Sequence, residues 1–306
     1  MIRMNWFLIA LIPPALWSAT NHIDKYLISK FFKGGGVGAL MVFSSLIGIF
    51  LLPIVAWLHP EVLSFSLNNI LIAVNGSLYV LAVLPYFYAL QKDEASVAVP
   101  LFQLIPVFSY VLAYFVLGET LTGGQMLGGL LVVLGAIAIT LDLSSGKGIK
   151  FKKEVFWLMM LSSVIFSLNF LFFKYFAIQS SFWYVSFWEY VGFAMFAFLL
   201  MVFVKPYREQ FIDILKKNSL MVIGLNGVNE VINIVAKIAF NFASLLTPIT
   251  MTWVVNGFQP FFVILYGVGL TMLFPKVVKE NIEKKALTQK FMAAIVMFVG
   301  IYFLGK

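Results

Sequence analysis

The sequence contains no cysteine, which excludes disulfide bonds, thiol nucleophiles and cysteine-ligated metal sites. Its two histidines, His22 and His59, lie far apart and neither has the ligand spacing of a metal site. The triplet Gly34-Gly35-Gly36 is not followed by the Gly-Lys-Ser/Thr of a phosphate loop, and no acid-base cluster is visible. We therefore expect no catalytic residue, no metal, no cofactor and no ATP-driven step.

Charge is also scarce. Only 11% of the 306 residues are charged and 62% are hydrophobic, with a mean hydropathy of +0.98. A soluble domain carries roughly 25% charged residues, so lipid must be the solvent for most of this chain. The net charge of +8 then indicates contact with the membrane surface rather than with nucleic acid.

The sequence consists largely of long apolar runs. They predict an all-α integral membrane protein with about ten transmembrane helices, because the runs are continuous rather than alternating. The first run, interrupted by Pro13 and Pro14, is interpreted as an uncleaved span rather than a signal peptide. The expected spans lie near 5–25, 37–58, 70–91, 95–117, 124–142, 154–174, 183–204, 219–240, 245–273 and 288–305.

The chain repeats itself at a spacing of about 150 residues. Matched pairs are Trp17-Ser18 with Phe166-Ser167, Asn75-Gly76 with Asn226-Gly227, and Ala95-Ser96-Val97 with Ala243-Ser244-Leu245. We expect two five-helix repeats, residues 1–145 and 146–306, joined near Ser144 to Lys153. An odd number of spans per half inverts the second copy, an architecture that many secondary transporters share; duplication without transport is the alternative.

The first half also carries a set of short motifs: Ala89-Leu90, Ala95-Ser96-Val97-Ala98, Pro106-Val107-Phe108, Leu117-Gly118-Glu119, Leu121-Thr122, Gln125 and Gly128. This pattern resembles the EamA module of the drug/metabolite transporter superfamily. The resemblance implies ten helices, two inverted halves, a central substrate cavity and export or exchange of small metabolites. The second half departs from the pattern, because a basic stretch from Phe274 to Gln289 places Lys285 where Glu119 would align. No substrate is carried over for that reason.

A polar stripe interrupts the eighth span: Asn226, Asn229, Glu230, Asn233 and Lys237 recur at the steps of one helix face. A charge at membrane depth costs about 3 kcal/mol, so the stripe must face protein or a water-filled cavity. Either it forms a wall of a substrate cavity, with Glu230 holding a cation or a proton, or it is a neutralised network that joins helices. A direct contact between Glu230 and Lys237 is not expected, since they are two turns apart.

Further candidates lie on other spans. Tyr79 and Tyr86 match Glu230 and Lys237 in the first half, so the two walls would differ chemically. Glu189 is either a proton-coupling carboxyl or an interfacial residue near a helix end. Trp17 and Asn169 are expected to line the cavity, whereas Asp24 and Lys25 are expected at the membrane surface. An aromatic cage for a cationic or aromatic substrate would use Trp17, Tyr79, Tyr86 and Trp253.

Helix-breaking residues occupy corresponding places in the fourth and ninth spans. Proline removes a backbone donor and frees a carbonyl, which can bind substrate where it lines a cavity; a simple packing kink is the alternative. The residues concerned are Pro100, Gln103 and Pro106 in one span, and Pro248, Asn256, Gly257, Gln259 and Pro260 in the other.

Basic residues concentrate on one side of the predicted topology. Of the 21 Lys and Arg, 17 follow odd-numbered spans, which by the positive-inside rule places both termini outside the cytoplasm. The family resemblance implies both termini inside. We adopt the charge rule as the prediction. The 17 residues are Lys25, Lys30, Lys33, Lys92, Lys147, Lys150, Lys152, Lys153, Lys205, Arg208, Lys216, Lys217, Lys276, Lys279, Lys284, Lys285 and Lys290.

Together these observations predict a secondary transporter in a bacterial or archaeal cytoplasmic membrane. It would move a small solute such as an amino acid, a nucleoside-like metabolite or an amphipathic cation by alternating access, with a proton or an exchanged solute as the coupling partner. A monomer surrounded by lipid would suffice. The competing hypothesis is a non-transporting sensor or scaffold whose polar stripe is structural.

Overall fold

The computed structural model describes residues 5–31, 37–117, 122–142, 150–247, 249–275 and 279–306. The predicted motif residues Gly118, Glu119 and Leu121, most of the joint between the halves, and Pro248 lie outside the described residues. Nearly every described residue is helical, as expected for an all-α integral membrane protein.

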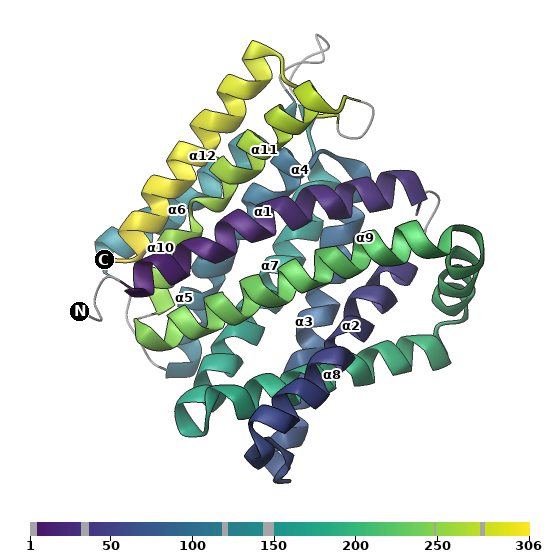
Figure 1. Cartoon of the computed structure of the whole chain (residues 1–306). Coiled ribbons are helices and arrows are strands. Elements are labelled where there is room, and N and C mark those ends of the chain that lie inside the picture. Colours follow the sequence, from purple (N-terminus) through teal and green to yellow (C-terminus); the bar gives the residue numbers. More distant parts are fainter. Residues whose placement is uncertain (1–4, 32–36, 118–121, 143–149, 248, 276–278) are drawn as a thin grey trace.

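The helices follow one another as Figure 1 shows. The first half comprises α1 (Asn5–Phe31), α2 (Val37–Leu58), η2 (Pro60–Leu63), α3 (Leu67–Lys92), α4 (Ala95–Ala98), η3 (Val99–Gln103), α5 (Leu104–Leu117) and α6 (Gly123–Ile139). The second half comprises α7 (Lys153–Gln179), α8 (Phe182–Phe203), α9 (Lys205–Leu246), α10 (Ile249–Asn256), α11 (Gln259–Leu273) and α12 (Lys284–Leu304). Between them, strands β1 (Leu141–Asp142) and β2 (Lys150–Phe151) pair antiparallel.

Within the described ranges, 8 helical segments are long and apolar enough to cross a membrane. Two further segments fall short of that standard for different reasons. The helix α1 has 27 residues but carries several polar and charged side chains in its second half, and α6 is apolar but has only 17 residues. The count of ten spans therefore stays a prediction.

The structure tests two expectations about where helices are interrupted. The expected breaks are confirmed, because η3 interrupts the fourth span at Pro100 and a turn at Gly257 separates α10 from α11. The loop expected between the seventh and eighth spans is wrong. Residues 205–218 continue as helix, so that α9 has 42 residues.

Many contacts between the two halves occur in pairs, in which each helix of one contact is replaced by the corresponding helix of the other half. The helix α1 packs on α9 and α3 packs on α7; α2 packs on α9 and α3 packs on α8; α1 packs on α11 and α5 packs on α7. Two contacts join corresponding helices directly, α2 with α8 and α6 with α12. Figure 1 shows α6 and α12 side by side at one edge of the bundle, with α1 and α9 crossing its front.

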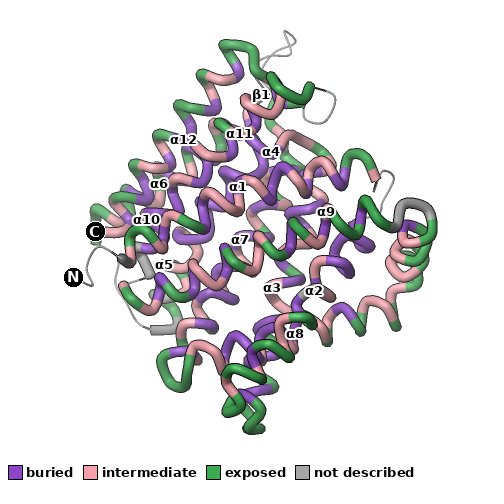
Figure 2. Tube along the Cα trace, viewed as in Figure 1, coloured by how far each residue is buried: buried purple, intermediate pink, exposed green. Residues whose placement is uncertain are grey.

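Polarity is arranged in reverse of a soluble protein. Large apolar side chains point outward, with Trp57 80% and Phe115 77% exposed, whereas Glu189 and Asn226 are fully buried. Figure 2 shows this as exposed residues along the outer helix faces and buried residues between the helices. A hydrocarbon solvent requires this arrangement, since apolar surface costs nothing there and a lipid-facing charge costs several kcal/mol.

Glycines allow two of these contacts to be very close. A Cβ on Gly76 of α3 would lie 2.0 Å from the Glu189 carbonyl oxygen, and one on Gly192 of α8 would lie 1.9 Å from the Ala73 carbonyl oxygen. A Cβ on Gly128 of α6 would lie 2.6 Å from the Gly300 carbonyl oxygen of α12, and the reverse approach is equally short. Small residues at helix contacts are typical of membrane proteins, where packing rather than water drives association.

Candidate functional site

A cavity lies between the two halves and is lined by side chains from α1, α2, α3, η3, α5 and from α7, α8, α9, α10 and α11. It encloses about 980 Å³ of space that atoms do not fill, including the opening. The helices α6 and α12 contribute no residue to its lining.

The polar stripe of α9 forms one wall of this cavity. Glu230, Asn233 and Lys237 line it, and Glu230 Oε1 accepts a hydrogen bond of 2.5 Å from the Ser44 hydroxyl of α2. Lys237 does not pair with Glu230, as their separation predicted. Its ammonium instead lies 3.2 Å from both carboxylate oxygens of Glu189, in an ion pair whose two side chains are almost fully buried.

An adjoining wall comes from α1, which packs on α9 and has Trp17, Asn21 and Asp24 on one face. The expectation that Asp24 lies at the membrane surface is wrong, since this residue is 4% exposed. Asp24 Oδ1 accepts a 2.7 Å hydrogen bond from the Asn229 amide of α9, and Oδ2 accepts one of 3.0 Å from the Tyr86 hydroxyl. The spacing Trp17, Asn21, Asp24 is itself a helical face and was a signal that Asp24 shares the cavity.

The broken helix of the second half is tied to α1 by amide side chains. Gln259 donates from Nε2 to Asn21 Oδ1 at 3.2 Å, and Asn256 donates from Nδ2 to Gln259 Oε1 at 3.3 Å. Gln103, from the break in the first half, donates to the Asn256 carbonyl oxygen at 3.4 Å. The two breaks therefore meet at the wall of the cavity, which explains why polar residues cluster there.

The structure divides the predicted site residues into two groups. Those that line the cavity are Glu230, Asn233, Lys237, Asn256, Gln259, Trp17, Tyr79 and Tyr86. The others are buried behind the lining and contact it or its neighbours: Asn229 bonds to Asp24, Glu189 to Lys237, Asn169 to Glu189, and Gln103 to Asn256. Asn226 is fully buried, and neither its amide oxygen nor its amide nitrogen has a hydrogen-bond partner among the described residues.

Aromatic side chains supply most of the apolar lining, and sequence reasoning identified only part of them. The cage residues Trp17, Tyr79, Tyr86 and Trp253 all line the cavity. So do five phenylalanines and a tyrosine outside this cage, since nothing separates them by pattern from lipid-facing aromatics: Phe87, Phe102, Phe166, Phe170, Phe193 and Tyr190.

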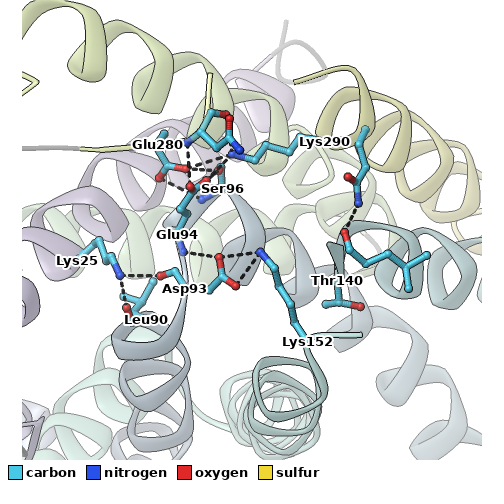
Figure 3. A network of polar contacts seen from close by, with 12 residues as sticks. Lys25, Leu90, Asp93, Glu94, Ser96, Thr140, Lys152, Glu280 and Lys290 are labelled. Carbon is cyan, nitrogen blue, oxygen red and sulfur yellow. Dashed lines mark hydrogen bonds and ion pairs between the residues drawn. The ribbon is translucent and has the colours of Figure 1, made fainter. Parts of the chain in front are cut away.

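A second polar cluster lies at one end of the bundle, outside the cavity lining, and is drawn in Figure 3. Lys290 of α12 lies 2.5 Å from a Glu94 carboxylate oxygen and 3.4 Å from one of Glu280, and the Ser96 hydroxyl donates to Glu280. Nearby, Lys25 donates to the carbonyl oxygens of Leu90 and Asp93. This end cluster joins the ends of α1, α3, α4 and α12.

Two basic residues of the end cluster are not the loop charges that the sequence predicts. Lys25 and Lys290 were counted as loop charges, yet Lys290 is only 5% exposed and both bind groups of the protein. Burial, with the Glu94 carboxylate beside it, raises the pKa of Glu280 to about 7. Burial also opposes ionisation of Glu94, but its hydrogen bond with Glu280 and the charge of Lys290 outweigh this and lower the pKa of Glu94.

Comparison with known proteins agrees with the resemblance read from the motifs. Residues 4–141 match the model of the EamA-like transporter family, which is part of the drug/metabolite transporter superfamily. The chain is similar to an uncharacterized protein of Methanocaldococcus jannaschii, with 33% identity over 82 residues, which is 27% of this chain and 56% of that one.

A second relative is an uncharacterized transporter of Clostridium kluyveri, with 27% identity over 148 residues, which is 48% of this chain and 46% of that one. The matched regions thus span about half the length of each of these curated relatives. A solved crystal structure of a protein without a functional name is similar over 98% of this chain and 96% of its own, with a TM-score of 0.53 and 15% identity. At that identity the likeness shows the fold alone.

Proposed function

We propose that this chain is a secondary transporter of the drug/metabolite type, which moves a small organic solute through the central cavity by alternating access. The match to a family of transporters supports this class over an enzyme. The carrying observation is the cavity itself, because helices of both halves line it and buried polar and charged side chains point into it. Intramembrane ionisable residues that face a cavity are typical of solute and ion pathways.

We further propose that residues 1–145 and 146–306 are inverted five-helix repeats. The paired helix contacts support this, since the principal contacts between the halves, such as α1 on α9 and α3 on α7, occur in pairs with the halves exchanged. In such an arrangement the two halves rock against each other around a fixed midplane site. The matched breaks near Pro100 and Gly257 lie at corresponding places in the two halves.

The competing function is a sensor or scaffold that binds within the cavity but never exposes it to both faces of the membrane. The ion pair between Lys237 and Glu189 would then serve only to hold α8 and α9 together. Exposure of the cavity to both sides separates the two functions, whatever the substrate.

Thiol labelling from each side of the membrane can measure this exposure. Because the sequence contains no cysteine, a single introduced cysteine is the only thiol that can react. Ser45 lines the cavity, and its hydroxyl donates to the Met41 carbonyl oxygen one turn earlier, so Ser45→Cys is a nearly isosteric change. We expect the cysteine to react with a membrane-impermeant methanethiosulfonate added to either side of oriented proteoliposomes.

Ser64→Cys is the matched control, since Ser64 is exposed in the connection between η2 and α3 and should react from one side only. Reaction of the Ser45→Cys protein from a single side, in the presence and absence of solutes, would favour the scaffold and overturn the transporter assignment.

A second test addresses the stripe directly. Glu230→Gln removes a cavity charge while keeping a side chain that can still accept from Ser44. We expect solute flux in proteoliposomes to fall by at least tenfold or to lose its dependence on a proton gradient, with normal membrane insertion. Wild-type flux in this variant would show that Glu230 has no part in transport.

A further inference from the structure

Two carboxylates of the cavity have no cationic partner among the described residues. Asp24 and Glu230 both line the cavity and both are at least nine-tenths buried. The ion pairs of the described residues include neither of them. Their hydrogen-bond partners are neutral: Asn229 and Tyr86 for Asp24, and Ser44 for Glu230.

These two carboxylates line the same cavity from two helices, α1 and α9, that pack on each other. Asn229, which donates to Asp24, is the residue immediately before Glu230 on α9. The two acids are therefore brought together across the contact between α1 and α9. Like charges in a poorly solvated cavity repel strongly, and a cation placed between them relieves this repulsion.

Among the described residues, Lys237 is the one cation that lines the cavity, and it already has an anionic partner. Lys237 lies 3.2 Å from both oxygens of Glu189, and Glu189 is also held by a 2.9 Å hydrogen bond from Asn169. An anionic ligand would have to break this buried pair, which costs several kcal/mol. Within the part of the chain that the structure describes, the cavity thus presents two carboxyl groups without a cationic partner and no cation without an anionic one.

The aromatic lining also suits a positively charged ligand. The ammonium of Lys237 already lies 4.1 Å from the centre of the Tyr79 ring, which shows that this wall accepts a positive group on its face. Tyr79 is stacked on Phe193 at 5.0 Å, and Trp253 packs against Phe170 at 5.3 Å. These rings form an apolar surface beside the two carboxylates.

We propose that the solute of this transporter is an organic cation, an ammonium group on an aromatic or aliphatic body. The ammonium binds between Asp24 and Glu230, and the body packs against Trp17, Tyr79 and Trp253. This inference rests on the proposed transport function and specifies the charge of its substrate. It also gives Asp24 a binding role, although the sequence placed this residue at the membrane surface.

The test compares four probes of nearly equal size that differ in charge. Purified full-length protein is titrated calorimetrically at pH 7 with phenethylammonium, 2-phenylethanol, 3-phenylpropionate and phenylalanine. We expect phenethylammonium to bind at least tenfold more tightly than 2-phenylethanol, which corresponds to about 1.4 kcal/mol, and 3-phenylpropionate to bind most weakly.

Variants identify the groups responsible. Asp24→Asn and Glu230→Gln should each reduce the ratio of cation affinity to alcohol affinity at least threefold. Glu209→Gln is the control, because Glu209 is an exposed carboxylate of α9 that pairs with Lys205 outside the cavity. Two separate variants keep the test valid if one of them fails to fold, as judged by gel filtration.

Each other outcome overturns the cation assignment. It fails if the alcohol or the anion binds as tightly as phenethylammonium, if no probe binds, or if neither variant changes the preference. Such a failure remains distinct from failure of the transporter assignment, which the two-sided reactivity of Ser45→Cys decides. If the cavity opens to both faces but binds phenylalanine most tightly, the transporter assignment stands and the organic-cation assignment is wrong.

Discussion

Replacing Glu280 by glutamine should remove a contribution to the stability of the protein that decreases as pH rises from 5 to 7. In the end cluster this carboxyl is 8% exposed, and burial raises its pKa to about 7, against about 4.5 in the unfolded chain. The charged and titratable groups facing it are Glu94, Lys290, His22, whose Nδ1 lies 3.9 Å away, and Lys25.

The sign and size follow from the pKa shift. Between pH 4.5 and 7 the folded state holds a proton on Glu280 that the unfolded state has released, so stability falls as pH rises. The contribution is fully present below 4.5 and lost by about 7. A difference of about 2.5 pKa units corresponds to about 3 kcal/mol at most, because one unit is 1.36 kcal/mol.

The assay is the thermal unfolding of wild type and Glu280→Gln in detergent, measured in half-unit steps from pH 5 to 8. The stability difference between the two proteins should shift in favour of the variant up to pH 7 and then level off. Other titrating groups are common to both and largely cancel. Glu94, whose pKa is lowered, stays ionised over this range. Parallel stability curves for the two proteins between pH 5 and 7 would refute the reasoning.

Two further predictions concern helix packing. Gly128→Ala should destabilise the protein by about 1–3 kcal/mol, because its Cβ would lie 2.6 Å from the Gly300 carbonyl oxygen; Gly124→Ala, which meets no atom closer than 3.9 Å, should leave the melting temperature within about a degree. Equal melting temperatures for these two variants would contradict the packing argument. Lys237→Met should cost about 3–5 kcal/mol by leaving Glu189 unpaired, and adding Glu189→Gln should recover part of that loss. Additive losses in the double variant would show that the pair is not coupled.

Helix positions were the most predictable part of this protein. The apolar runs placed the spans well, because a membrane requires about 20 apolar residues and the sequence has little else. Helical periodicity also identified Glu230 and Lys237, since a charged residue in an apolar run stands out. The prediction of a loop at residues 205–218 is wrong because charged residues are typical both of loops and of exposed helices, and here they belong to a helix.

Partners across helices were not predictable. Periodicity shows which residues share a face but not which helix that face meets, so the pairing of Lys237 with Glu189 came only from the structure. Asp24 and Lys290 were assigned to the surface because they lie near the ends of their spans. Both are buried by segments distant in sequence, Asp24 by α3 and α9 and Lys290 by the segments around Glu94 and Glu280. Nothing in the local sequence reports such neighbours.

The glycine contact between α6 and α12 joins the last helix of each half, away from the cavity wall. Backbones that touch at Gly128 and Gly300 cannot slide past each other without separating. In the proposed transport cycle this seam would be the stationary axis, and the ten cavity-lining segments would rotate about it. Labels placed on either side of the seam should accordingly keep a constant distance while those across the cavity change theirs.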